Sequence, residues 1–148
     1  MQALSLFFAV FIFIKLISVK NQDNADAIIE LGRNATIAGN MLVYHHAILD
    51  YAVTHPAATG EVRNTVLKLP AWFNYDPKIK NFISNGKSYV YCINPEPGLI
   101  VDLFIKSHGS LLTGIKYRGG LYNTFSGILS IYLPEVIPDN SVVYAGGG

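Results

Sequence analysis

The sequence has little charge and only one cysteine. Of its 148 residues, 14% are Asp, Glu, Lys or Arg, and eleven basic residues nearly balance ten acidic ones. A chain with neither a basic excess nor a basic run lacks the positive surface with which many proteins bind nucleic acids, so we expect no nucleic-acid partner. The single cysteine, Cys92, excludes an intrachain disulfide framework and a cysteine-rich zinc site. With 51% hydrophobic residues, the sequence is not that of a disordered chain.

Histidines and carboxylates show no spacing typical of catalysis or metal binding. His45 and His46 are adjacent, so they leave a helix about 100° apart, which favours helix-surface histidines over a metal site. His55 and His108 lie in other parts of the sequence, and the acidic residues are scattered. Folding can bring scattered acids and bases together, which leaves a small hydrolase as an alternative function. We predict no catalytic residue, no metal and no cofactor.

Two further motifs are weak. Gly86-Lys87-Ser88 resembles the end of a phosphate-binding loop, but that loop needs a glycine at position 81, which is Asn81, and the residues precede a strand pattern. We therefore interpret them as a turn. Cys92 and His108 would suit a nucleophile and its base, but Cys92 lies in an apolar strand pattern, where a buried and unreactive thiol is the default. No small-molecule substrate is expected.

An apolar run opens the chain. Residues 3–19 contain one charge, Lys15. As a helix they would be about 25 Å long, against a hydrocarbon core of about 30 Å. Lys15 is close enough to the end of the run to extend its ammonium to the headgroups. A cleaved signal peptide would need a basic start and a small-residue cleavage site, which are missing. We therefore predict a retained single-pass membrane anchor, residues 1–20, that contacts the membrane through residues 3–19.

The charges that flank this run bear on topology. Lys15 lies near its end and Lys20 and Arg33 follow it, and the positive-inside rule would place the main domain in the cytoplasm. The bias is only three charges, with Asp23 and Asp26 among them.

The sequence pattern of the remaining residues, 21–148, predicts a single α+β unit. Residues 21–24 are polar and would cap a new helix at Asp23 or Asn24, although anchor and helix together would also make one long helix. Apolar residues recur at steps of three or four up to His55-Pro56, which predicts an amphipathic helix over residues 21–55.

Residues 56–148 predict a small α+β domain. The segment after Pro56 reads mostly as loop. Beyond it, the pattern predicts strands at 87–93 and 111–117, a helix at 99–106 between them, a hairpin strand at 121–125, an edge strand at 141–144 and a disordered 146–148 tail. The fold class is therefore an N-terminal transmembrane helix that runs into an amphipathic helix. This helix packs on a small, mainly antiparallel sheet with one β-α-β crossover.

One aromatic cluster lies beside prolines in the predicted loop. Trp72, Phe73 and Tyr75 fit a partner-contact patch, because aromatic residues are enriched where proteins bind each other. The same residues would also fit a role in closing the core against the amphipathic helix.

The whole layout resembles the PilM family of type IVB (thin) pilus systems of conjugative plasmids and related pilus operons. The resemblance covers nearly the full chain and depends on turn and packing residues. Besides the apolar N-terminal segment, they are Tyr51-Ala52-Val53-Thr54-His55-Pro56, Thr59-Gly60-Glu61-Val62, Leu67-Lys68-Leu69-Pro70-Ala71-Trp72-Phe73, Asn85-Gly86-Lys87-Ser88-Tyr89-Val90-Tyr91, Pro97-Gly98-Leu99, Leu133-Pro134 and Ser141-Val142-Val143.

The resemblance implies a non-enzymatic scaffold in the inner membrane, in the apparatus or basal body that assembles the pilus. Its partners would be other pilus-assembly proteins, and its main domain would face the periplasm. A minor pilin is the alternative in the structural class. Pilins carry a short basic leader and a glutamate at the fifth mature position, whereas this chain has no acidic residue before Asp23 and no basic leader.

Overall fold

The computed structural model describes residues 2–147, and the side chains of residues 2–25, 27 and 128–130 lie outside this description. The chain divides into two units, one ending at Arg33 and the other spanning Asn34–Gly148. Helix α1 (Gln2–Thr54) contributes to both. The predicted divisions 1–20, 21–55 and 56–148 stay a prediction.

Helix α1 is continuous through the polar residues 21–24. The predicted break and the cap at Asp23 or Asn24 are therefore wrong, and the alternative of one long helix is confirmed. The physical reason is that asparagine and aspartate cost a helix only a fraction of a kcal/mol each, about 0.7 at most, and no proline interrupts it here. Among the described residues, no helix combines the length and the apolarity that crossing a membrane requires. The predicted anchor falls on residues 1–20, whose side chains lie outside the description.

The second unit is an α+β fold, as predicted. Its elements after α1 are η1 (Asn64–Val66), β1 (Ile79–Ser84), β2 (Lys87–Cys92), α2 (Leu99–Lys106), β3 (Thr113–Tyr117), β4 (Gly120–Asn123), β5 (Ile128–Tyr132) and β6 (Val142–Gly146). The helix predicted at residues 99–106 is confirmed with the same bounds.

The six strands form one sheet in the order β1-β2-β6-β3-β4-β5, and every neighbouring pair is antiparallel. Strands β2 and β3 are both antiparallel to β6, so they run parallel to each other and α2 connects them. This connection is the predicted β-α-β crossover, with β6 inserted between its two strands.

The last strand corrects two predictions. Residues 141–144 were expected to form an edge strand, but β6 lies at the centre of the sheet, between β2 and β3. Gly146, expected in a disordered tail, is buried and pairs with Ser88 of β2. A short strand near the end of a chain is often predicted as an edge strand. Val142, Val143 and Ala145, however, are buried on both faces of the sheet, and only a strand with neighbours on both sides is buried in this way.

Strand β1 was missed, because the prolines before it indicate a loop. Its residues alternate between buried and half-buried positions, but the central buried position holds Asn81, which interrupts the apolar alternation expected of a strand. The turn that joins β1 to β2 was predicted correctly. Asn85 and Gly86, with φ of 52° and 74°, form a two-residue hairpin loop closed by the Ser84–Lys87 pair.

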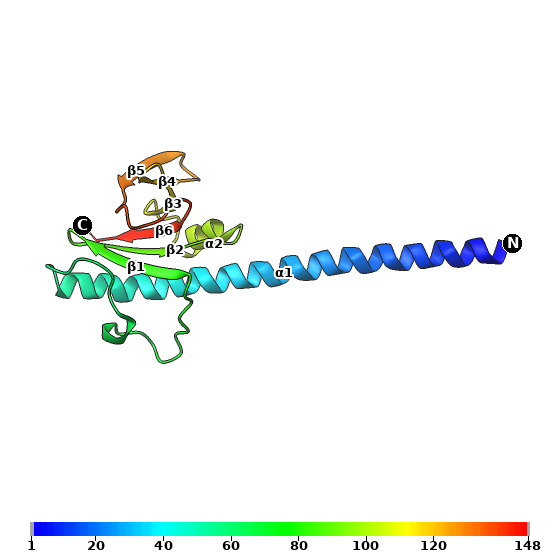
Figure 1. Ribbon diagram of the computed structural model, residues 1–148, viewed down its shortest axis with the longest axis horizontal. Helices are drawn as coiled ribbons and strands as arrows, with labels where there is room; N and C mark the ends of the chain where they lie inside the picture. Colours follow the sequence, from blue (N-terminus) through cyan, green and yellow to red (C-terminus); the bar gives the residue numbers. More distant parts are fainter. Residues whose placement is uncertain (1, 148) are drawn as a thin grey trace. The chain divides into compact units, whose positions relative to one another are not determined.

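The main core lies between the helices and one face of the sheet. The part of α1 after residue 34 runs along the sheet next to β1 and β2 (Figure 1). Met41, Tyr44 and Ile48 of this helix are fully buried, and they belong to one apolar cluster with residues of β1, β2, α2 and β6. The loop after α1 returns on the other side of the helix and packs Val62 and Leu67 against the same cluster (Figure 1).

A second, smaller core covers the opposite face. Tyr89 and Tyr91 of β2 pack there with Leu121, Val143 and Ala145, under Leu133 and Ile137 of the segment that leads into β6.

The covering segment is held in place by Lys116, which is only 5% exposed. Its Nζ donates hydrogen bonds to the carbonyl of Pro134 at 3.1 Å and to the carbonyl of Ile137.

Candidate functional site

The predicted aromatic patch lies against α1. Phe73 stacks on the buried ring of Tyr44, with ring centroids 5.8 Å apart and an interplanar angle of 16°, and Tyr75 contacts the same ring at 6.3 Å and 59°. Trp72 is 69% exposed, whereas Phe73 is half-buried against the core. The three residues therefore have different positions: Phe73 and Tyr75 attach the loop to the helix, and Trp72 faces solvent.

Hydrogen bonds at both ends order this loop. The backbone N–H of Phe73 donates to the carbonyl of Pro70 at 2.9 Å, and the N–H of Lys78 donates to Oδ1 of Asp76 at 2.8 Å. From α1, Nδ2 of Asn40 donates to the carbonyl of Asn74 at 3.3 Å. The prolines that indicated a loop in the sequence thus belong to tight, bonded turns.

A buried polar network around Asn81 connects the loop, the helix and the sheet. Its Oδ1 accepts from the N–H of Val62 at 2.8 Å, and its Nδ2 donates to the carbonyl of Val62 at 2.9 Å and to the Tyr44 hydroxyl at 2.8 Å. The Tyr44 hydroxyl in turn donates to Oδ1 of Asn64 in η1. Burial raises the pKa of Tyr44 to about 12, so the hydroxyl stays protonated and keeps donating. This network was not predicted; the interruption of the apolar alternation at Asn81 is the sequence signal that could have indicated it.

A groove runs along α1 beside the aromatic loop. One part, of about 390 Å³, is lined by Val43, His46, Ala47, Asp50, Lys68 and Pro70. An adjoining part of about 240 Å³ shares Ala47, Asp50 and Lys68 and extends to Tyr51, Thr54, His55, Val66 and Leu67. Pro70, which lines the groove, lies two residues before the exposed Trp72 in the sequence. The lining mixes apolar side chains with the oppositely charged Asp50 and Lys68.

The groove also contains a histidine and a carboxylate at helical spacing, which the sequence analysis did not single out. Asp50 follows His46 by four residues, so the two lie one turn apart on α1, and both line the groove. Within the part of the chain that the structure describes, no group of three His, Cys, Asp or Glu residues could hold a metal ion. The pair therefore serves here as polar lining.

His45 differs from its predicted surface position. It is only 4% exposed, and its ring stacks on Tyr144 of β6 with centroids 4.0 Å apart. Burial, followed by the nearby His46, lowers the pKa of His45 to about 4, so the ring is neutral at pH 7. The helix-surface interpretation holds for His46 and is wrong for His45, because residue 45 lies on the stripe of α1 that faces the sheet.

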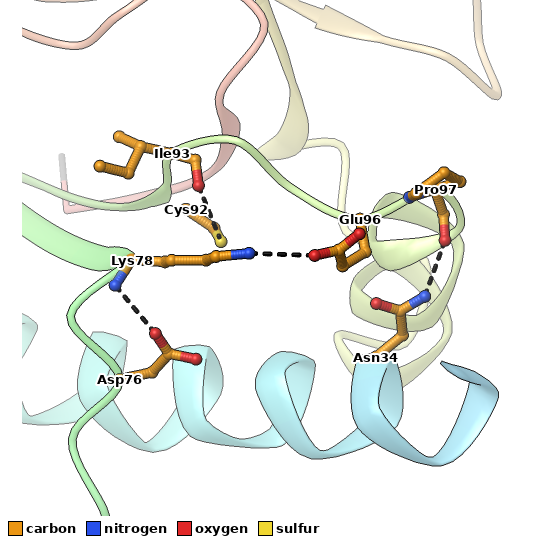
Figure 2. A network of polar contacts seen from close by, with 7 residues as sticks. All are labelled: Asn34, Asp76, Lys78, Cys92, Ile93, Glu96 and Pro97. Atoms are coloured by element: carbon orange, nitrogen blue, oxygen red, sulfur yellow. Dashed lines mark hydrogen bonds and ion pairs between the residues drawn. The ribbon is translucent and has the colours of Figure 1, made fainter. Parts of the chain in front are cut away.

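Cys92 is a buried thiol, as the sequence indicates. Its Sγ donates to the carbonyl of Ile93 at 3.8 Å, and burial raises its pKa to about 11, far from the range of a reactive thiolate (Figure 2). His108, the base that the sequence analysis considered for Cys92 and did not favour, is exposed after the end of α2.

Polar contacts also close the region around Cys92 (Figure 2). Nζ of Lys78 forms an ion pair of 3.0 Å with Oε1 of Glu96, and Nδ2 of Asn34 in α1 donates to the carbonyl of Pro97 at 2.7 Å. These contacts attach the segment before α2 to β1 and to α1, so they have a structural role.

Comparison with known proteins agrees with this architecture. The sequence pattern of the PilM family matches residues 8–145. The crystal structure of a protein named PilM from Escherichia coli B7A is 30% identical with a TM-score of 0.61, and the match covers 78% of this chain and 93% of that chain. The crystal structure of a protein named PilM from Pseudomonas aeruginosa 2192 is also 30% identical, with a TM-score of 0.49 and coverage of 77% and 93%. No curated protein matches the sequence. Because the family pattern spans almost the entire sequence, the chain belongs to the PilM family.

Proposed function

We propose that this protein is a non-enzymatic scaffold of a type IVB pilus assembly apparatus, anchored in the bacterial inner membrane and active in the biogenesis of a conjugative thin pilus. Membership of the PilM family ties the chain to pilus biogenesis. The observation that carries the more specific role is the aromatic loop, in which Trp72 is 69% exposed while Phe73 and Tyr75, which follow it, contact Tyr44 of α1. An exposed tryptophan on an ordered support is typical of a protein-contact site.

The buried polar groups support a scaffold in preference to an enzyme. Asn81 donates to the Val62 carbonyl and to the Tyr44 hydroxyl, Lys116 donates to backbone carbonyls, the ring of His45 stacks on Tyr144, and the Cys92 thiol is protonated. Asn81, Lys116 and His45 each join one segment of the chain to another, and the Cys92 thiol bonds the carbonyl of its neighbour Ile93. We therefore assign them to the stability of the fold.

The membrane anchor and the placement of the main domain rest on the sequence. Residues 3–19 contain one charge in seventeen positions, and they fall within helix α1. A single helix then leads from the anchor into the folded unit, and we place that unit in the periplasm, where it meets other pilus-assembly proteins. A reporter that is active on only one side of the membrane, fused through a flexible linker after residue 148, tests this placement.

The scaffold role is tested by complementing a deletion strain. Wild type should restore pili, whereas Trp72→Ala should restore few or none, with normal levels of the major pilin and of the variant itself. Tyr117→Ala is the matched control, because Tyr117 is also exposed but lies in β3, away from the loop. Normal piliation in the deletion strain, or equal complementation by both variants, would contradict the proposal.

The same strains separate the alternatives. Recovery of the protein in sheared filaments, or cleavage by a prepilin peptidase, would favour a minor pilin. Loss of piliation on alanine substitution of an exposed histidine, His46, His55 or His108, would favour a small hydrolase. His45 is left out of that series because its substitution also disturbs the core.

A further inference from the structure

The sheet has two edges, and they differ in how they are covered. Strands β1 and β5 lie at the ends of the strand order, so each pairs with a neighbour on one side only. An uncovered strand edge presents a row of free backbone N–H and C=O groups, to which another strand can pair.

The β1 edge is covered by the chain itself. Gly60 and Ile83 exchange two backbone hydrogen bonds, of 2.8 and 2.9 Å, and the side chain of Asn81 bonds both backbone groups of Val62. The segment around residues 60–62 thus occupies the place of a further strand. Lys80 adds a charge to this edge.

The β5 edge is open. The N–H of Leu133 donates to the carbonyl of Gly119 at 2.9 Å, and Tyr132 is the register partner of Gly120. In an antiparallel pair, backbone groups alternate in direction along the strand, so the N–H and C=O of Tyr132 point away from β4. Tyr132 is 85% exposed, and in the described part of the chain no segment pairs with the outer side of β5.

This open edge also lacks the residues that usually protect one. Between Arg118 and Glu135 there is no charged residue over sixteen positions, a stretch that contains the whole of β4 and β5. Natural proteins protect exposed edges with lysine, inward-pointing charges, proline within the strand or a β-bulge. Of these features β5 has only a register shift against β4, between the pairs of Gly120 and Tyr122. Here the first proline, Pro134, follows the strand.

We propose that β5 binds β5 of a second copy of this chain in antiparallel orientation, so that two sheets join into one across a two-fold axis. The partner must offer an open and uncharged strand edge. Among the strands that the structure describes, β5 is such an edge, because β1 is covered and carries Lys80. Antiparallel pairing of two identical neutral strands places no like charges opposite each other, and a two-fold contact is closed, so it gives a dimer and not a filament.

The test uses substitutions at Tyr132. Tyr132→Pro removes the outward N–H while leaving the hydrogen bonds to β4, because the Tyr132 N–H points away from β4. Tyr132→Thr is the matched control, since it keeps the N–H and a good strand former. Tyr132→Lys places a charge at the β5 edge of each copy. It tests pairing through this edge even if the proline variant fails to fold.

The measurement is sedimentation equilibrium of the full chain in a density-matched nonionic detergent. We expect wild type and Tyr132→Thr to dimerise with similar dissociation constants, and the proline and lysine variants to raise that constant by about tenfold or more. A monomeric wild type would overturn the proposal, as would equal dimerisation of all variants, which would indicate contact through the N-terminal helix. Weakening by Tyr132→Thr to the same extent would also overturn it, because the contact would then depend on the side chain.

Discussion

Acidification should destabilise the folded unit through His45. The ring is buried between α1 and β6, stacked on Tyr144, and the position of its Nε2 leaves no room for a side chain at Gly146. Water cannot solvate an imidazolium there, and His46 lies close enough to oppose a second positive charge. The pKa of His45 is therefore about 4 in the folded chain, against an ordinary value of 6.5.

The sign of the effect follows from which state binds the proton first. Between pH 6.5 and 4 the unfolded chain protonates this histidine and the folded chain does not, so unfolding becomes more favourable as the pH falls. The contribution of His45 is fully present above pH 6.5 and is lost as the pH approaches 4. Since one pKa unit corresponds to 1.36 kcal/mol, the interval from 6.5 to about 4 is worth about 3 kcal/mol.

The assay is urea unfolding of the full chain in nonionic detergent at several pH values from 7 to 4, followed by near-ultraviolet circular dichroism of the tyrosines. His45→Gln removes the titrating group, and we expect wild type to lose about 3 kcal/mol more than this variant over the interval. His46→Gln is the control, because residue 46 is exposed one position away, and it should retain most of the wild-type loss. If wild type and His45→Gln lose stability in parallel, another group is responsible and the buried position of His45 is refuted.

Four further substitutions test the packing, each measured as a change in the free energy of unfolding in urea. Gly146→Ala should destabilise by about 1–3 kcal/mol, because its Cβ would lie 2.6 Å from Cε1 of His45; full stability would contradict this close approach. Gly39→Ala, at an α1 position with open space, should stabilise by about 0.5–1 kcal/mol, and a loss would show that the helix is crowded there. Asn81→Leu should cost about 2–4 kcal/mol and speed amide exchange at Val62, since both backbone groups of Val62 lose their partner; unchanged exchange would refute the network. Lys116→Met should cost about 1–3 kcal/mol, because the Ile137 carbonyl loses the ammonium donor and the Pro134 carbonyl keeps only its bond from the N–H of Ile137; a neutral result would show that water replaces the ammonium.

Elements specified by neighbouring residues could be predicted from the sequence. The α2 helix ends before His108-Gly109, which adopt left-handed conformations with φ of 56° and 76°, and the β1–β2 turn depends on Asn85-Gly86. In each case the decisive signal lies within a few residues of the feature, so no knowledge of the tertiary structure is needed.

Features that depend on distant parts of the chain could not be predicted in this way. The central position of β6 results from pairing with β2 and β3, which lie roughly 50 and 30 residues earlier, and no local pattern specifies those partners. The burial of His45 has the same origin, because it is β6 that covers the ring. Asn81 misled the strand prediction for a related reason: its polar side chain is buried because the segment at Val62 returns to bond it.

The different roles of Trp72, Phe73 and Tyr75 in the aromatic loop follow from these long-range contacts. A partner that binds a flexible tryptophan must first order it, and that loss of conformational freedom reduces the affinity. In this structure Phe73 and Tyr75 fix the loop on Tyr44, and Tyr44 is fixed in turn by Asn81, so the backbone at Trp72 is already ordered before any partner arrives. If Trp72 is the proposed contact, substitution of Phe73 should therefore weaken partner binding there, and substitution of Asn81, which bonds Tyr44 from β1, should act in the same direction.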